Sequence, residues 1–444
     1  MKVGFISLGC SKNQVNCEQM MWQTHVAGHE LSLSAEDCDV AVINTCGFLQ
    51  EACQEAMEEF GKLRALQEAG RLRHILVTGC MAQRYQEELD QRFPGASGFV
   101  GVSGYEKIGE VLASLKGGGD STPQRIFEDN SAPVPETDRV VIGSEYSAYL
   151  RIAEGCDNRC TYCVIPSIRG PFRSRPMEEI LREAASLAAD GIREVIVIAQ
   201  DITRYGLDLY GQRRLPELLR ALCQVEGIDW VRVHYLYPDE VTEELIETIA
   251  GEEKIVKYID LPIQHISDRI LRAMHRRGTG AEIRTLFRRL RERIPGVVIR
   301  TSLITGFPGE TVEEFEELCE FLREFKLERA GIFAYSPEPG SVAAELDDQV
   351  EPVEKRRRLE LLTQLQMEVT DRYCEERVGQ TVTVLCEGFD EESGRYWGRS
   401  GAESPGIDGV IYLEGSEELE PGQFYVVTIT AAEDGESVGE VIEG

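Results

Sequence analysis

Residues 154–170 read EGCDNRCTYCVIPSIRG and place three cysteines, Cys156, Cys160 and Cys163, in C-x3-C-x2-C spacing. Three thiolates this close together can bind three corners of a four-iron cluster and leave the fourth iron open. A structural zinc site would need a fourth Cys or His at suitable spacing, and none lies nearby. A thioredoxin-type C-x-x-C pair would need a different context. The stretch therefore predicts a [4Fe-4S] cluster whose open corner binds a ligand from outside the protein.

The surrounding sequence predicts an α/β fold for this cluster. Helical segments separate most of six apolar runs, at residues 148–154, 194–200, 230–236, 256–261, 297–303 and 331–336. Six successive strand and helix units indicate a partial (β/α)6 barrel, in which the site lies at the carboxyl ends of the strands. Because Cys156 follows the first strand directly, the cluster is expected at that rim.

A second cysteine triplet is scattered through the N-terminal part of the chain. Residues 1–116 alternate apolar strands with helices, which predicts an α/β domain with a parallel sheet. Cys10, Cys46 and Cys80 each come one or two residues after such a strand. The carboxyl ends of neighbouring parallel strands lie along one edge of a sheet, so these cysteines could converge there. They are a candidate second cluster site, again with one corner open.

The C-terminal part predicts a third unit. A glycine-rich run at residues 116–124 interrupts the α/β pattern and indicates a linker. A long helix is expected over 353–377, and after it short strands at 381–389, 394–400, 409–415 and 424–432 indicate a small all-β barrel. We therefore expect an N-terminal domain over 1–116, a linker over 117–138, a central barrel over 139–372 and a β-barrel over 373–444.

Composition limits the choice of partners and compartment. The 78 acidic and 47 basic residues give a net charge of −31, which opposes binding to nucleic acid and favours a basic protein partner; high solubility is the alternative reading. Residues 378–444 alone carry fifteen acidic residues and two arginines. No run of about eighteen apolar residues occurs, and residues 1–13 lack a cleavable apolar stretch, so we expect no signal peptide. We expect a cytoplasmic protein without a membrane partner, whose thirteen cysteines serve ligation or packing rather than disulfides.

Together, the two cysteine triplets and the terminal barrel resemble the radical S-adenosylmethionine (SAM) methylthiotransferase family, over essentially the whole chain. The resemblance implies a radical SAM core, a C-terminal TRAM-like barrel, two [4Fe-4S] clusters and two SAM molecules per product. It implies that one SAM donates a methyl group to sulfur held at the Cys10, Cys46 and Cys80 cluster. The other is cleaved at the Cys156, Cys160 and Cys163 cluster to a radical that activates a C–H bond for sulfur insertion.

Several motifs resemble the branch that modifies the β-carbon of an aspartate in the twelfth small-subunit ribosomal protein. They are SLGCSKN at 7–13, NTCGF at 44–48, AQDITRYG at 199–206 and LPIQHISDRIL at 261–271. The branch that modifies tRNA adenosine typically has NTCA and GQNV at the second and third of these places. The acidic barrel also disfavours tRNA and suits a basic ribosomal protein. The tRNA methylthiotransferase, and a non-catalytic ribosome-binding protein with structural clusters, are the alternatives.

Other candidate site residues are less specific, and no catalytic amino acid is predicted beyond the clusters and SAM. Residues expected to contact the cofactor are Tyr162, Gln200, Gln264, Gly306 and Gly309. Asp201 and His265 also end barrel strands, although a lone histidine is more often structural. Seven further cysteines are expected to be buried packing residues: Cys17, Cys38, Cys53, Cys223, Cys319, Cys374 and Cys386. A low-potential electron donor such as flavodoxin or ferredoxin is expected as a second partner.

Overall fold

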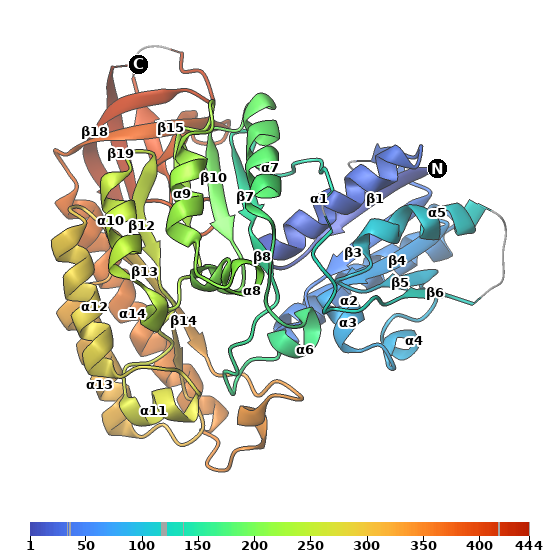
Figure 1. The fold of residues 1–444 in the computed structure, drawn as a ribbon, viewed down its shortest axis with the longest axis horizontal. Coiled ribbons are helices and arrows are strands. Elements are labelled where there is room, and N and C mark those ends of the chain that lie inside the picture. The colour runs from blue at the N-terminus through green and yellow to red at the C-terminus, as the bar shows by residue number, and fades with distance from the viewer. Residues whose placement is uncertain (33, 35–36, 117–121, 136, 416–417, 444) are drawn as a thin grey trace.

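The computed structural model of the chain describes all residues except 33, 35–36, 117–121, 136, 416–417 and 444. The described residues form two α/β units side by side, and a β-barrel sits at one end of the central unit (Figure 1). The predicted fold class is confirmed. No helix in the described part of the chain combines the length and the apolar character needed to cross a membrane.

The N-terminal unit is a six-stranded parallel sheet in the order β2-β1-β3-β4-β5-β6. Helices α1 and α5 pack on one face with Val42 and Leu76, and α2 packs on the other with Ile43 and Val77. The strands are β1 (Lys2–Ser7), β2 (Glu30–Ser32), β3 (Val40–Thr45), β4 (His74–Gly79), β5 (Gly98–Val100) and β6 (Gln124–Ile126). The helices are α1 (Ser11–Val26), α2 (Gln50–Glu68), α3 (Cys80–Arg84), α4 (Leu89–Arg92) and α5 (Ile108–Lys116).

Part of the expected linker belongs to this sheet. Residues 117–121 and 136 of the linker lie outside the described residues, but β6 within it pairs in parallel with β5. This strand was not predicted, because it has only three residues and directly follows the glycine-rich run. The domain boundaries stay predictions.

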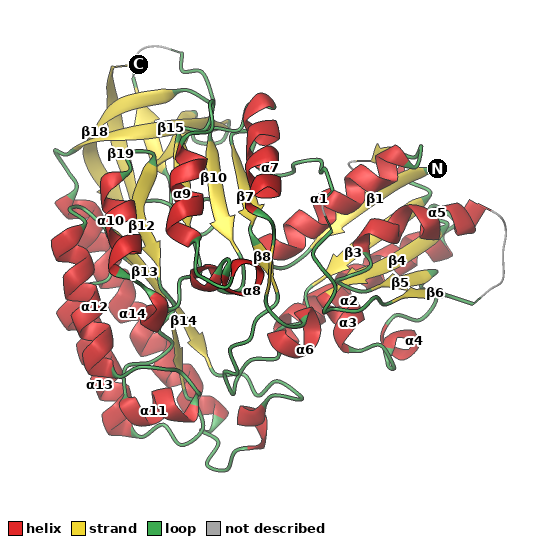
Figure 2. Ribbon diagram, in the orientation of Figure 1, coloured by secondary structure: helices red, strands yellow, loops and turns green. Residues whose placement is uncertain are grey.

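The central unit is a parallel sheet of six strands in the order β14-β13-β12-β11-β10-β7, as the six apolar runs predict. The strands are β7 (Ser147–Arg151), β10 (Glu194–Ile198), β11 (Trp230–Val233), β12 (Ile255–Asp260), β13 (Val298–Thr305) and β14 (Arg329–Ala334). Its long helices, which lie along one side of the sheet in Figure 2, are α7 (Met177–Ala189), α9 (Leu215–Cys223), α10 (Glu243–Gly251), α12 (Gly280–Arg293) and α13 (Val312–Phe325). Short elements at the strand ends are β8 (Ala153–Glu154), β9 (Arg173–Ser174), α6 (Ile165–Arg169), α8 (Leu207–Tyr210) and α11 (Asp268–Ala273).

The sheet does not close into a complete barrel, and the N-terminal unit lies against its open side. β7 and β14 are the two edge strands. Val15 of α1 packs with Ile196 and Ile198 of β10, together with Tyr149 and Tyr235. The first helix of the N-terminal unit therefore reaches the inner face of the central sheet.

Helix α7 begins at Met177 with Pro176 as its N-cap and without a side-chain cap. Ser174 lies in β9, where its hydroxyl donates to Asp208 at 2.6 Å. This tertiary hydrogen bond connects β9 to α8.

The C-terminal unit is a closed five-stranded barrel joined to the core by α14 (Pro352–Glu376). Its strands are β15 (Thr381–Asp390), β16 (Arg395–Ser400), β17 (Ile411–Glu414), β18 (Phe424–Glu433) and β19 (Glu436–Glu443). The barrel packs against the first residues of β10 and β11: Arg399 pairs with Glu194 at 2.7 Å, and the rings of Phe424 and Trp230 are 4.8 Å apart. It therefore lies at the amino ends of the core strands, opposite to the cysteine-bearing rim.

Candidate cluster sites

The scattered cysteines follow three neighbouring strands. Cys10, Cys46 and Cys80 come after β1, β3 and β4, and these strands are adjacent in the sheet. Cys10 is the N-cap of α1, and Cys80 is the first residue of α3. As whole residues, Cys10 is exposed, Cys46 is half-buried and Cys80 is buried. The parallel topology thus brings all three to one edge of the sheet, as the sequence predicts.

Three glycines let the loops that carry these cysteines approach one another. A Cβ atom on Gly9 would lie 2.8 Å from Cβ of Cys46, and one on Gly47 would lie 2.6 Å from the backbone nitrogen of Met81. Gly79 has a φ of +93°, and a Cβ there would lie 2.5 Å from Oδ1 of Asn44. A side chain at any of these positions would push neighbouring loops apart.

The second triplet, Cys156, Cys160 and Cys163, lies in the loop between β8 and α6. Cys160 Sγ lies 3.5 Å from the hydroxyl of Tyr237, and the backbone N–H of Ile165 donates to Cys163 Sγ at 3.4 Å. The guanidinium of Arg276 stacks 3.8 Å from the centroid of the Tyr237 ring. Burial raises the pKa of Cys156 to about 11 and that of Cys163 to about 12, so metal binding at this loop must displace thiol protons.

The donor sets fit iron–sulfur clusters better than single metal ions. Among the described residues, no three His, Cys, Asp or Glu side chains are close enough together to hold one ion. A cubane cluster places its irons at separate corners, so thiolates that bind different irons stand further apart than ligands of one ion. Each triplet offers thiols alone, which suits an iron–sulfur cluster.

Arg169 joins the two triplets. It is the last residue of α6, six positions after Cys163, and it is 1% exposed. Its Nη2 donates to Cys80 Sγ at 3.3 Å and to Asn13 Oδ1 at 2.7 Å, while Nη1 is 2.9 Å from both carboxylate oxygens of Glu154. Val164 and Ile168 pack in one apolar cluster with Cys80 and Phe48. The two cysteine sites are therefore neighbours across the interface between the units.

The electrostatics of this interface favour negative charge on Glu154 and Cys10 but not on Cys80. Burial opposes ionisation of Glu154, but Arg169 and Arg151 outweigh it and lower its pKa to about 2. Burial likewise opposes a thiolate at Cys10, but Lys12 and Arg169 lower its pKa below the ordinary value. At Cys80 burial dominates and raises the pKa to about 11 despite Arg169.

The predicted cofactor contacts lie at the same rim in different environments. Gln200 donates to Glu154 Oε1 at 2.7 Å, and its own Oε1 is buried without a hydrogen-bond partner in the described structure. Tyr162 packs with Phe307 and Tyr335. Gln264 has a φ of +71° and bridges to Leu303 of β13. Their contact with SAM stays a prediction.

The glycine-rich loop after β13 packs against Lys355 of α14 and Arg269 of α11. A Cβ on Gly306 would meet the side chain of Lys355 in α14 at 2.6 Å, and one on Gly309 would lie 3.6 Å from Arg269. Glu310, which the sequence analysis did not single out, is buried and accepts from the Thr305 hydroxyl at 3.1 Å. His265 is fully buried beside Glu310, and its Nδ1 accepts from the Ser267 N–H at 3.0 Å, which fits a structural histidine.

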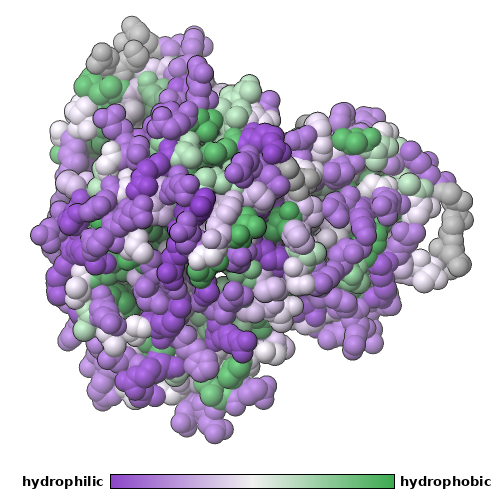
Figure 3. Space-filling model, in the orientation of Figure 1, coloured by the Kyte–Doolittle hydropathy of each residue, from purple (hydrophilic) through white to green (hydrophobic). Residues whose placement is uncertain are grey.

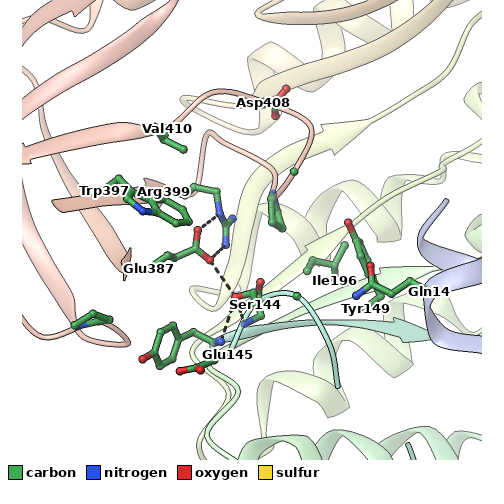
Figure 4. Close-up of a pocket in the computed structure, with 16 residues that line it drawn as sticks. Gln14, Ser144, Glu145, Tyr149, Ile196, Glu387, Trp397, Arg399, Asp408 and Val410 are labelled. Carbon is green, nitrogen blue, oxygen red and sulfur yellow. Dashed lines mark hydrogen bonds and ion pairs between the residues drawn. The ribbon is translucent and has the colours of Figure 1, made fainter. Parts of the chain in front are cut away.

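A large groove of about 610 Å³ lies away from the cysteines. Figure 4 shows it between the core and the terminal barrel, with Tyr149 and Ile196 on one side and Trp397, Arg399 and Glu387 on the other. None of the six cysteines lines it. It is therefore separate from the candidate cluster sites.

Comparison with known proteins agrees with the division of the chain into three units. The Radical SAM superfamily model matches residues 150–322, the Uncharacterized protein family UPF0004 model matches 2–101, and the TRAM domain model matches 378–442. Ribosomal protein uS12 methylthiotransferase RimO of Acetivibrio thermocellus is 43% identical, covering 99% of this chain and 98% of the relative. RimO of Geobacter sulfurreducens is 43% identical over the same shares. The chain belongs to the RimO family.

A solved structure of a protein outside the RimO family has a similar fold. The radical S-adenosylmethionine methyltransferase TsrM from Kitasatospora setae matches with a TM-score of 0.54 at 16% identity, over 74% of this chain and 72% of that chain. At this identity the likeness shows the fold alone. Membership of the radical SAM superfamily implies SAM and a [4Fe-4S] cluster as cofactors of the RimO family member.

Proposed function

We propose that this enzyme methylthiolates the β-carbon of an aspartate in ribosomal protein uS12, using two [4Fe-4S] clusters and two SAM molecules. The observation that carries the proposal is the contact of Arg169 with Cys80, which places two three-thiol sites side by side. Full-length similarity to relatives named uS12 methylthiotransferases supports the substrate. We also propose a low-potential electron donor, flavodoxin or ferredoxin, and a cytoplasmic location, where ribosomal proteins are made.

We propose different roles for the two cysteine sites. We assign Cys156, Cys160 and Cys163 to the cluster that binds SAM, and Cys10, Cys46 and Cys80 to the cluster that holds sulfur. When bound, the first cluster and SAM supply the chemistry that activates an unreactive C–H bond. Arg169 and Glu154 hold the two loops together, and the buried surroundings of the core cysteines keep water from the reacting groups.

The test is anaerobic iron and sulfide analysis of the wild type and of Cys46→Ala, combined with mass spectrometry of purified uS12. We expect about eight irons per wild-type chain and about four in Cys46→Ala, because one cubane of four irons is lost. Cys46→Ala should still release 5′-deoxyadenosine but give no methylthiolated product. Cys53→Ala is the control, since Cys53 is a buried cysteine seven residues further along the same segment.

Three results would contradict the proposal. Full iron content and product from Cys46→Ala would show that the N-terminal site is wrongly assigned. Methylthiolation of tRNA rather than uS12 would favour the tRNA branch. Absence of 5′-deoxyadenosine in the reduced wild type would favour a non-catalytic protein with structural clusters.

A further inference from the structure

Lys12 is a buried cation beside Cys10 at the junction of the two cluster sites, and no carboxylate among the described residues forms an ion pair with it. It lies in the first turn of α1, two residues after Cys10, and is 6% exposed. Its Nζ stands 3.0 Å above the centroid of the Tyr235 ring. In the part of the chain that the structure describes, this ammonium makes no hydrogen bond or ion pair with a side chain.

The nearby carboxylates are already engaged by other groups. Asp260 accepts from Arg300 Nη1 at 2.8 Å and from the Tyr235 N–H at 3.1 Å. Glu154 accepts from Arg151, Arg169 and Gln200. A buried ammonium without an ion pair is costly, and an aromatic face compensates only in part. Lys12 therefore has capacity to bind one further anion.

The position of Lys12 indicates which anion reaches it. Tyr235 follows β11 at the carboxyl ends of the core strands, and it has a φ of +65°, which few residues with a side chain adopt. This conformation holds its ring under the Lys12 ammonium. The ammonium thus lies between the Cys10 loop and the carboxyl ends of the core strands, which is where the proposed function places the target side chain.

We propose that Lys12 binds the side-chain carboxylate of the target aspartate and so positions the adjacent β-carbon between the two cluster sites. The inference rests on the proposed function and adds a positioning residue to it. A buried ammonium matches a carboxylate in charge and can donate charge-assisted hydrogen bonds to it. An amide of the same shape would gain much less, so Lys12 would also select aspartate over asparagine.

The test compares binding of two peptides to the anaerobically reconstituted full-length enzyme. Both peptides span the modified site of uS12, and one carries Asn in place of the target Asp. Wild-type enzyme should bind the Asp peptide about 10- to 100-fold more tightly, the range expected for one hydrogen bond to a charged group. Lys12→Met should lose this preference, and Lys12→Arg should retain part of it.

Three further measurements distinguish loss of substrate positioning in Lys12→Met from damage to the fold or to a cluster site. Lys12→Met should keep the wild-type iron content and release 5′-deoxyadenosine with unchanged SAM dependence, while product falls by about 10- to 100-fold. Lys254→Met is the matched control, because Lys254 is a half-buried lysine whose Nζ donates to the carbonyls of Val225 and Ile228, far from both cysteine sites. It should keep the wild-type preference between the peptides.

The outcomes are distinct. Lys12→Met with an unchanged Asp preference would overturn the inference, as would loss of iron or a weakened SAM dependence, which would place Lys12 at a cofactor instead. A wild-type enzyme that produces no methylthiolated uS12 would overturn the proposed function, and this inference with it.

Discussion

At the scale of single residues, Glu154 is a buried carboxylate at the interface between the two candidate cluster sites. It is shared by Arg169 and Arg151 at 2.8–2.9 Å and is 7% exposed. We expect Glu154→Gln to lower the free energy of unfolding by about 3–5 kcal/mol, because two buried arginines lose their shared counter-charge. Denaturant unfolding of the anaerobic enzyme, followed by circular dichroism, measures this. Glu68→Gln, in an exposed pair with Arg64, should change the value by less than about 0.5 kcal/mol.

The same residue predicts a pH dependence. The pKa of Glu154 is about 2 in the folded protein against an ordinary value of 4.5, so the folded state favours the carboxylate. Its contribution to stability is complete above about pH 5 and is lost as the pH falls towards 2. The difference in unfolding free energy between wild type and Glu154→Gln should be constant from about pH 6 to 8 and shrink at lower pH. A difference that grew on acidification would contradict this assignment.

The six cysteines of the candidate sites could be predicted from the sequence. The charged residues between the two sites could not, because their roles depend on which residues surround them in the fold. The six cysteines have recognisable spacing or follow apolar strands. Arg169, Glu154 and Lys12 are ordinary charged residues in a sequence rich in charge. Their roles depend on the packing of the N-terminal unit against the core, which brings together residues more than 130 positions apart, such as Arg151 and Gln19. No local pattern encodes that contact.

At the scale of elements, the ends of β1, β3 and β4 depend on close packing of backbone. Gly79 ends β4 in a positive-φ conformation, and a Cβ there would also lie 2.6 Å from the carbonyl oxygen of Thr45. We expect Gly79→Ala to displace Cys80 and to lower the iron content towards about four per chain, because one cubane would be lost. Gly28→Ala is the control: its φ is +78° and nothing lies within 4 Å, so it adds backbone strain alone. Iron analysis and thermal unfolding of both variants would decide, and equal iron contents would contradict the packing argument.

Strand prediction succeeded where burial imposes an apolar run. Interior strands of the two parallel sheets are covered on both faces and have a continuous apolar sequence, for example VAVINT in β3, which is buried throughout. β19 was missed because its sequence, ESVGEVIE, contains three glutamates, a serine and a glycine and has no continuous apolar run. β6 was missed because it is a short edge strand of exposed and half-buried residues. The errors therefore lie at edges and in half-exposed elements, where the hydrophobic signal is weakest.

At the scale of the whole molecule, charge and chemistry are placed at different ends of the core. Polar residues cover most of the face in Figure 3, as expected for a chain with a net charge of −31. The acidic barrel packs at the amino ends of the core strands, whereas both cysteine sites lie at the carboxyl ends. The barrel therefore lies away from both cysteine sites. Its charge should act on the approach of a basic protein instead.

Neutralising the barrel should accordingly slow association without changing turnover. Glu391, Glu392, Glu418 and Glu420 are exposed acidic residues of the barrel. We expect their joint replacement by Gln to reduce the association rate constant for uS12 about tenfold at low salt, with dissociation and kcat little changed, because steering acts before contact. The difference should disappear above about 0.5 M salt, where screening shortens the range of the field. Stopped-flow binding measures the association rate constant and its dependence on salt.

The control variant replaces four exposed residues of the N-terminal unit and so removes the same total charge elsewhere: Glu55, Glu58, Glu68 and Glu110. An equal effect from this control would show that net charge, rather than the barrel, attracts the substrate.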